Sequence, residues 1–202
     1  MRRLRVPGAA VVAAVVAALL LAGCSTGHDA VDVNNGGEFR FVAGTPAGDV
    51  IPAAERRSAP QFSGTLLDGT AFSSSKDLAD RVAVLNFWGS WCAPCRVETP
   101  EFQQVYAEVR DRGVAFLGID VKETDKQFPL AFVRRFGIEF PSLYDPSGET
   151  ALAFRDYPAN AIPSTIVLDR QGRVAAVYTG PVAKDDLRTV LGRLIGEGGG
   201  DG

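Results

Sequence analysis

The chain has 202 residues, of which 46% are hydrophobic, and carries a formal net charge of −3. This length and composition suit one globular domain with additional segments. The acidic balance, with no basic cluster after the first residues, argues against a nucleic-acid-binding protein, and we expect no nucleic-acid partner.

Residues 1–23 have the build of a secretory signal peptide. Three arginines within residues 2–5 precede an apolar run over 6–21, which is short for a membrane span. The sequence Leu-Ala-Gly-Cys at 21–24 resembles a bacterial lipobox, so we expect Cys24 to be lipidated and to become the mature N-terminus. An ordinary cleaved signal and an uncleaved anchor are the alternatives. All three place the rest of the chain outside the cytoplasm.

Low-complexity segments flank the periodic part of the chain. Residues 24–57 are rich in Gly, Ala, Pro, Asn and Asp with little periodicity, which predicts a flexible tether of the kind that a lipid-anchored domain needs. Residues 197–202 are mostly glycine and predict a disordered tail. Between these segments, residues 59–70 suggest a β-hairpin with a turn at Asp68-Gly69.

The central part alternates strand-like and helix-like patterns. Residues 81–89 and 114–120 are apolar runs typical of strands buried on both faces, whereas 164–169 and 173–178 form a clear antiparallel hairpin. Helices are expected at 92–112, 125–136, 149–154 and 184–195. Within 125–136, Phe128, Phe132 and Phe136 fall on one face. The order of elements predicts an α/β fold with a central mixed sheet covered by helices on both faces.

Two cysteines stand two residues apart where a buried strand should pass into a helix. At the helix N-terminus, peptide dipoles and free N–H groups would stabilise the reactive thiolate of Cys92. Cys95, inside the first turn, would be more buried and would close or resolve a disulfide. The pattern predicts thiol–disulfide exchange, with Cys92 as the exposed attacking thiol and Pro94 stiffening the turn. The plain alternative is an inert local disulfide, although so short a loop gains little stability from one.

Half a zinc site is a second alternative for this pair. Structural zinc would need two more Cys or His ligands, and the chain has three cysteines and one histidine, His28, near its N-terminus. If Cys24 carries lipid, only Cys92 and Cys95 remain as thiols. We therefore expect no metal site and no cofactor other than a redox-active Cys92–Cys95 disulfide.

Glu98 follows Cys95 by three residues and should lie on the same helical face. A carboxyl group beneath the sheet beside a buried thiol would have a raised pKa and could shuttle the proton of Cys95. The alternative is an ordinary solvated acid that complements the helix dipole. The position of Glu98 in the sequence does not distinguish the proton shuttle from the solvated acid.

Pro163 stands directly before the strand at 164–169. A proline at the start of a strand is ordinary, but a cis Ile162–Pro163 bond would turn the backbone toward the cysteines and present a strand edge to a substrate. Of the two tryptophans, we expect Trp91 to be exposed at the rim of the site and Trp88 to be packed, although both could be core residues.

Residues 87–95 (FWGSWCAPC), with 162–165 (IPST) downstream, resemble the thioredoxin superfamily, and within it the extracytoplasmic TlpA/ResA/CcmG branch. The resemblance spans about residues 58–196. It implies a thioredoxin-like domain with an N-terminal β-hairpin extension, a cis Pro163 beside the active site and a functional glutamate at the position of Glu98. Substrate would be bound by Trp91, Pro94, Ile162 and Pro163.

The resemblance also implies a function. It is reduction of protein disulfides by a membrane-tethered enzyme, often at the Cys-x-x-Cys-His haem sites of apocytochromes c. Electrons would come from a CcdA/DsbD-type membrane protein, and a lipid would anchor the enzyme to the outer face of the bacterial cytoplasmic membrane. Cys92 would form a mixed disulfide that Cys95, helped by Glu98, resolves.

Three other functions remain open. A disulfide-donating oxidase would use the same fold, because the sequence does not set a reduction potential; the histidine that some strongly oxidising relatives carry between their cysteines is absent. A thiol peroxidase of the peroxiredoxin type resembles a Thr-x-x-Cys pattern, whereas Gly89 stands three residues before Cys92. A non-enzymatic binding lipoprotein would tolerate loss of both cysteines.

Overall fold

Buried apolar runs form the centre of a five-stranded sheet in the computed structural model of the protein, which describes residues 44–45 and 47–197. The strand order is β5-β4-β3-β6-β7. Strands β3, β4 and β5 are parallel, and β6 and β7 run antiparallel to their neighbours. The strands are β3 (Val82–Trp88), β4 (Val114–Val121), β5 (Ser142–Asp145), β6 (Ser164–Leu168) and β7 (Val174–Thr179). The predicted mixed sheet is confirmed.

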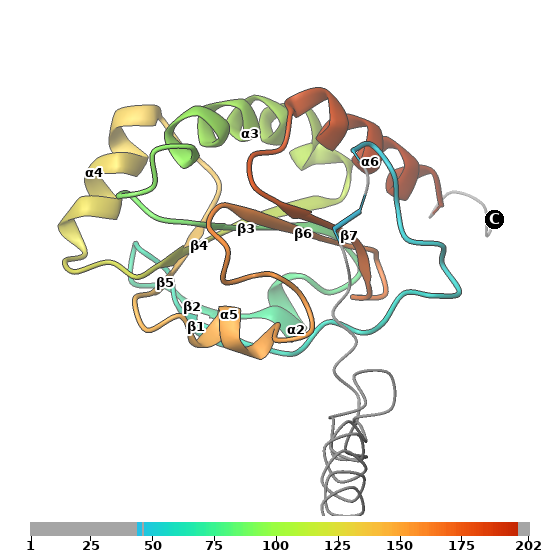
Figure 1. Cartoon of the computed structure of the whole chain (residues 1–202), viewed down its shortest axis with the longest axis horizontal. Coiled ribbons are helices and arrows are strands. Elements are labelled where there is room, and N and C mark those ends of the chain that lie inside the picture. Colours follow the sequence, from blue (N-terminus) through green and yellow to red (C-terminus); the bar gives the residue numbers. More distant parts are fainter. Residues whose placement is uncertain (1–43, 46, 198–202) are drawn as a thin grey trace, which may run out of the picture. The chain divides into compact units, whose positions relative to one another are not determined.

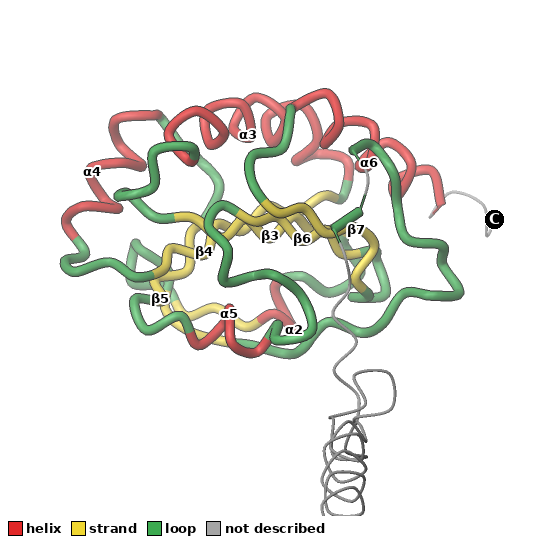
Figure 2. The backbone as a smooth tube through the Cα atoms, viewed as in Figure 1, coloured by secondary structure: helices red, strands yellow, loops and turns green. Residues whose placement is uncertain are grey.

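Helices cover both faces of this sheet, as Figures 1 and 2 show. On one face lie the three longer helices, and Val84 of the sheet packs there with apolar residues of two of them, such as Phe102 and Val190. On the other face, Leu85 packs with Phe72 and Phe154 from the shorter elements. The first group is α3 (Cys95–Val109), α4 (Gln127–Phe136) and α6 (Lys184–Glu197); the second is α2 (Ser74–Asp77), α5 (Glu149–Ala153) and the first two strands.

The expected N-terminal hairpin is present. Strands β1 (Ser63–Thr65) and β2 (Ala71–Ser73) pair antiparallel. Gly69 in the turn has φ 93°, a left-handed conformation that favours glycine. The Asp68 carboxylate accepts a hydrogen bond from the Thr70 N–H at 2.8 Å, which fixes the turn. A bridge between Leu66 and Leu143 joins the hairpin to β5.

Two expected helices differ in detail from the structure. The helix expected from residue 92 begins at Cys95 and ends at Val109, and a 3₁₀ turn η2 (Arg110–Arg112) follows before Gly113. In α4, Phe132 is buried, but Phe128 is 55% exposed. The three phenylalanines therefore do not all face the core.

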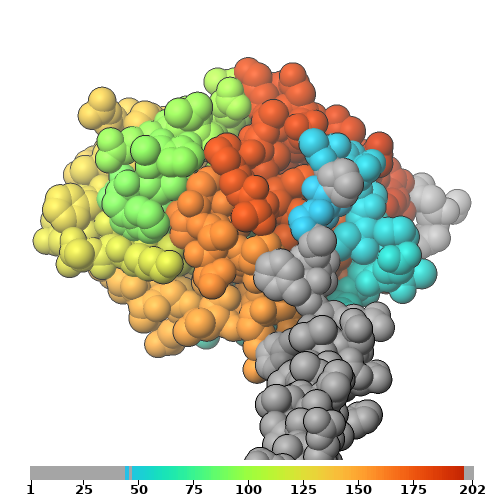
Figure 3. Space-filling view, viewed as in Figure 1, coloured from blue at the N-terminus to red at the C-terminus, as the bar shows by residue number. Residues whose placement is uncertain are grey.

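The segment before residue 58 is not a free tether where the structure describes it. The Thr45 N–H donates to the Val177 carbonyl at 2.7 Å, and the Ile51 N–H donates to that of Ala175 at 2.7 Å. The segment thus covers the outer edge of β7, an arrangement that blocks unwanted strand pairing. Figure 3 shows these residues, in blue and cyan, against the red C-terminal part. Residues 24–43 of the expected tether, the signal at 1–23, Cys24 and residues 198–202 of the tail lie outside the described part of the chain.

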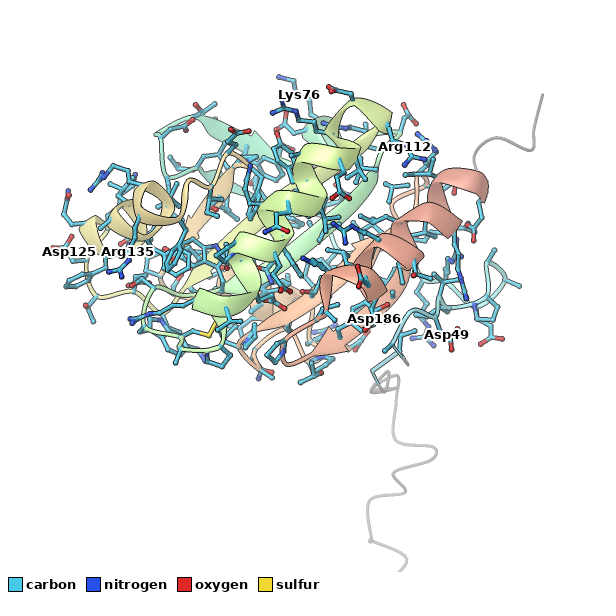
Figure 4. The ribbon with its side chains drawn as sticks, turned by 90° about the horizontal axis from the view of Figure 1, so that it is seen from above. Asp49, Lys76, Arg112, Asp125, Arg135 and Asp186 are labelled. Carbon is cyan, nitrogen blue, oxygen red and sulfur yellow. A yellow bond between two sulfur atoms is a disulfide. The ribbon has the colours of Figure 1, made fainter. Side chains whose placement is uncertain are left out.

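A buried arginine fixes this segment in place. The Arg56 side chain is 1% exposed, and its guanidinium contacts Asp169 at 3.3 Å and Glu197 at 2.6 Å. A buried guanidinium needs such partners. Asp49 continues the contact along α6 through Arg193, and Figure 4 shows Asp49 on the same side of the molecule as Asp186 of α6. The folded domain therefore begins at or before Gly44 and includes Glu197, which corrects the expected boundaries of 58 and 196.

Candidate active site

The two cysteines form a disulfide between the end of β3 and the start of α3. The Cα atoms of Cys92 and Cys95 are 5.3 Å apart. Cys95 is the first residue of α3, and its backbone N–H donates to Cys92 Sγ at 3.2 Å. Figure 4 shows the yellow disulfide at the beginning of this helix. After reduction, the same N–H would stabilise the Cys92 thiolate, as expected for a cysteine at a helix N-terminus.

Cys92 is less exposed than the sequence predicted. Cys92 is 3% exposed and Cys95 is 0% exposed. Both pack in one cluster with Leu67 and Trp88, to which Ile162 adds a partly buried side chain. The expectation of an openly exposed Cys92 is wrong, because these side chains cover the disulfide. As expected, Cys92 is the more exposed of the two cysteines, because Cys95 is fully buried.

The two tryptophans differ in exposure as expected. Trp88 is 1% exposed and lies 4.6 Å from the Phe132 ring, between ring centroids. Trp91 is 48% exposed, and its indole N–H donates to the Val121 carbonyl at 3.0 Å. A Cβ atom on Gly89 would lie 2.4 Å from Trp91 Nε1. The indole therefore occupies the space that any side chain at Gly89 would need.

Pro163 and Ile162 lie at the same end of the sheet as the disulfide. The Ile162–Pro163 peptide bond is cis, as the family resemblance implied. Ser164, the next residue, pairs with Phe87 near the end of β3. Ile162 packs against the cluster that contains both cysteines. Pro94 is exposed, whereas Pro163 is buried and its carbonyl accepts the Gly180 N–H at 2.9 Å.

Glu98 is a buried acid, so the solvated alternative is wrong. The residue is 2% exposed. One carboxylate oxygen accepts the Asn86 side-chain amide at 3.0 Å, and the other accepts the Val182 N–H at 2.8 Å. Burial raises the pKa of Glu98 to about 7, although these two hydrogen bonds act in the opposite direction. Glu98 can therefore hold or release a proton near neutral pH.

The sequence reasoning missed the residues that hold Glu98. Asn86 lies within the apolar run of β3, and its amide also donates to Thr165 Oγ1 at 3.2 Å. Val182 contributes only its backbone, in the loop before α6. A polar side chain in an otherwise apolar buried strand was the signal that could have identified Asn86. The Val182 N–H gives no signal in the sequence.

Within residues 44–45 and 47–197, no group of three or more His, Cys, Asp or Glu side chains is placed to hold a metal ion. None of the helices described for this part of the chain combines the length and apolar character that crossing a bilayer requires.

Comparison with known proteins identifies the family. The sequence profile described as the AhpC/TSA family matches residues 56–177, which is more than half of the chain. The chain belongs to the AhpC/TSA family. It is also 30% identical over 138 residues to "Thiol-disulfide oxidoreductase ResA" of Bacillus thuringiensis subsp. konkukian, covering 68% of this chain and 77% of the relative.

Two solved structures of thiol-disulfide proteins are also similar to this chain. A DsbF homologue from Corynebacterium diphtheriae has a TM-score of 0.69 and 37% identity, covering 76% of this chain and 99% of its own. A secreted thiol-disulfide isomerase from Corynebacterium glutamicum has a TM-score of 0.70 and 36% identity, with 77% and 98% covered. This AhpC/TSA family member is therefore a ResA-like thiol-disulfide oxidoreductase of the thioredoxin superfamily, with Cys92 and Cys95 as its cysteine pair.

The site of this AhpC/TSA member argues against peroxidase chemistry. The peroxidase pattern places threonine three residues before the reactive cysteine, where this chain has Gly89. A threonine there would collide with Trp91, as the 2.4 Å approach shows. The disulfide with Cys95 instead fits exchange between thiols and disulfides.

Proposed function

We propose that this thiol-disulfide oxidoreductase is a reductase of protein disulfides that acts outside the cytoplasm. The observation that carries the exchange chemistry is the buried carboxyl group of Glu98, one helical turn from Cys95, with a pKa raised by burial to about 7. The direction of exchange is proposed from the similarity to the ResA relatives. A resolving thiol that is 0% exposed cannot pass its proton directly to water. A carboxyl group that titrates near neutral pH can accept that proton.

The reaction follows from these positions. In the reduced enzyme, the Cys92 thiolate attacks one sulfur of the substrate disulfide, so that this S–S bond breaks and a mixed disulfide forms. The Cys95 thiol then gives its proton to Glu98 and attacks Cys92 Sγ. The enzyme disulfide closes, and the substrate leaves with both of its sulfurs reduced. Two electrons pass from the enzyme to the substrate, and a thiol donor must return them.

Substrates would dock over the exposed Trp91 and Pro94 and along the backbone at Ile162 and Pro163. We propose protein disulfides as the substrate class, including the Cys-x-x-Cys-His sites of apocytochromes c, and a CcdA/DsbD-type membrane protein as the electron donor. The support is the resemblance to the ResA branch. A cysteine-trapping experiment tests it: Cys95→Ser should retain covalent partners through Cys92. Recovery of the same partners with Cys92→Ser would contradict the assignment of the nucleophile.

We further propose that Cys24 is lipidated and ties the enzyme to the outer face of the cytoplasmic membrane. The support is the signal-like sequence of residues 1–23 and the small residues before Cys24. Processing should then be sensitive to globomycin, and the mature N-terminus should carry an acyl mass. A mature protein with an unmodified N-terminus would refute the lipid anchor without affecting the redox assignment.

A disulfide-donating oxidase is the second candidate. The observation in its favour is that two similar solved structures, at 37% and 36% identity, are described as a DsbF homologue and a secreted thiol-disulfide isomerase, and neither description names a reductase. The reduction potential of the Cys92–Cys95 pair separates the two functions. A value near the about −270 mV of thioredoxin supports the reductase, and one near the about −120 mV of DsbA supports the oxidase.

A further inference from the structure

A second buried acid lies on the sheet face that carries the disulfide. Asp120, near the end of β4, pairs with Trp88 of β3 and with Tyr144 of β5. It is 0% exposed, and neither carboxyl oxygen receives a hydrogen bond from any residue that the structure describes. An ionised carboxylate buried without donors is very costly. The surroundings therefore favour the protonated form of Asp120.

The neighbour of Asp120 is a second carboxyl group. Lys122 has a left-handed backbone with φ 57°, which turns the chain directly after β4. After this turn, the Glu123 side chain lies within hydrogen-bonding reach of the Asp120 side chain. Two ionised carboxylates have no proton with which to make this hydrogen bond. One proton on Asp120 supplies the missing donor.

Glu123 also holds the segment that leads to the reactive cysteine. Its Oε1 atom accepts the Ser90 backbone N–H at 2.6 Å. Beside this bond, the Trp91 indole donates to the Val121 carbonyl at 3.0 Å. The last residue of β4 and the turn after it thus contact residues 91 and 90, immediately before Cys92.

We propose that Asp120 is a positioning residue, whose carboxyl proton binds Glu123 and thereby holds Ser90 and Trp91 in the conformation that aligns Cys92 with α3. Asp120 does not touch the sulfur atoms; it acts through Glu123. The inference concerns the exchange activity itself and is independent of the direction of electron flow.

Burial and the other acids around Asp120 favour the same protonation state, and a cation would act in the opposite direction. Asp145 of β5 is a further acid, and together with burial and Glu123 it raises the pKa of Asp120 to about 9. Lys126 before α4 is the nearby cation, and its ammonium lies 5.4 Å from the centre of the Tyr144 ring. Trp88 from β3 brings no charge. Asp120 should therefore stay protonated across neutral pH and lose its proton only in alkaline solution.

Nuclear magnetic resonance on the full oxidised domain tests the proposal directly. The side-chain carboxyl carbon of Asp120 should titrate near pH 9, and the Ser90 amide nitrogen should shift with the same midpoint. In Asp120→Asn the side-chain amide is a permanent donor to Glu123, so the Ser90 shift should persist to alkaline pH. In Glu123→Gln the new side-chain amide can donate a hydrogen bond to the ionised carboxylate of Asp120 and so stabilise its charged form. The midpoint of the Asp120 titration should therefore fall by about two pH units. The exposed Asp111→Asn is the matched control and should change neither titration.

A functional readout separates positioning from simple packing. In reduced Asp120→Ala, Glu123 loses its donor, and the apparent pKa for alkylation of Cys92 should rise by about half a unit to one unit. Asp120→Asn should restore the original profile. The proposal is overturned if Asp120 titrates near its ordinary value, if Ser90 does not follow the Asp120 midpoint, or if the alanine variant keeps the original alkylation profile. Should Asp120→Ala fail to fold, the two titrations in the wild-type protein and in Asp120→Asn still decide.

Discussion

Glu98 and Asp120 are two buried acids on one face of the sheet, and they differ in what surrounds their oxygens. Each Glu98 oxygen accepts a hydrogen bond, from Asn86 and from Val182. Asp120 receives none from the described residues and faces Glu123. Burial raises both pKa values, to about 7 for Glu98 and to about 9 for Asp120. Donors to the charged form thus set whether a buried acid exchanges its proton at neutral pH or keeps it.

The largest effect is expected from removing the acid that exchanges its proton. Glu98→Gln should slow the disulfide exchange by about 100-fold, because general acid–base catalysis of this kind contributes at least that factor. The pH dependence of Cys95 alkylation should lose its step near neutral pH. Glu101→Gln removes a neighbouring charge from the same helix and should keep both the rate and the step within about twofold. An unchanged alkylation profile in Glu98→Gln would show that Glu98 is not the proton acceptor.

Replacing the acid that keeps its proton by asparagine should alter the pH dependence of stability. The folded-state pKa of Asp120 lies above its unfolded value, so its contribution is full below about pH 4 and is lost as the pH rises toward 9. In this window the stability of the wild type relative to Asp120→Asn should fall by about 1.4 kcal/mol per pH unit. For Glu98, whose folded-state pKa is about 7, the corresponding loss of stability with rising pH should end near pH 7.

Urea unfolding at pH 6, 7, 8 and 9 measures this difference, and Asp111→Asn again provides the control. A constant stability difference between the wild type and Asp120→Asn from pH 7 to 9 would mean that Asp120 is ionised in the folded protein at neutral pH.

Removing a hydrogen-bond donor from Glu98 should make it more like Asp120, which has none among the described residues. Asn86→Leu removes one donor from the Glu98 carboxylate and leaves its burial unchanged, so the pKa of Glu98 should rise from about 7 by roughly one unit. The step in the alkylation profile of Cys95 should move to higher pH by the same amount. Thr165→Val removes the other partner of the Asn86 amide and should leave the step in place. A step that stays at its original pH in Asn86→Leu would show that the Val182 N–H alone opposes the rise of the Glu98 pKa.

The smallest effect is expected at the turn between Asp120 and Glu123. Lys122 and Asp80 both have left-handed backbones, with φ 57° and φ 58°. Glycine at either position removes steric strain but adds freedom to the unfolded chain, so each variant should be more stable by about 0.5 kcal/mol. Thermal unfolding checks this. Because the turn is kept, Lys122→Gly should leave the Ser90 titration unchanged, and a lost titration would mean that the lysine side chain, not the turn, places Glu123.

The part of the fold that follows local patterns could be predicted from the sequence. The apolar runs of β3 and β4 and the Asp68-Gly69 turn carry their own signals. Helical periodicity put Phe128, Phe132 and Phe136 on one face, but it does not tell which of them the rest of the domain covers. Arg56 was assigned to a tether because its partners, Asp169 and Glu197, lie 113 and 141 positions further along the chain.

The candidate site divides in the same way. Cys92, Cys95 and Pro163 stand in motifs with fixed spacing, so the family resemblance could place them. The pKa of Glu98 depends on donors from β3 and from the loop before α6, which only the folded chain brings together. The sequence does mark Asp120, because it is a charged residue near the end of an apolar strand. Its interaction with Glu123 could not be predicted, because it depends on how the chain turns after β4.

The contact of Arg56 with Asp169 and Glu197 determines how the domain bears a mechanical load. If the chain before Gly44 is anchored, tension meets the hydrogen bonds of Thr45 and Ile51 to β7 and then the guanidinium clamp that Arg56 forms with Asp169 and Glu197. The clamp spreads that tension over the β6–β7 connection and the end of α6. The cysteine pair follows the last residue of β3, and the cis proline precedes the first residue of β6. Both therefore lie at the end of the sheet opposite the β6–β7 connection, and tension would reach the cysteine pair only after the clamp had opened.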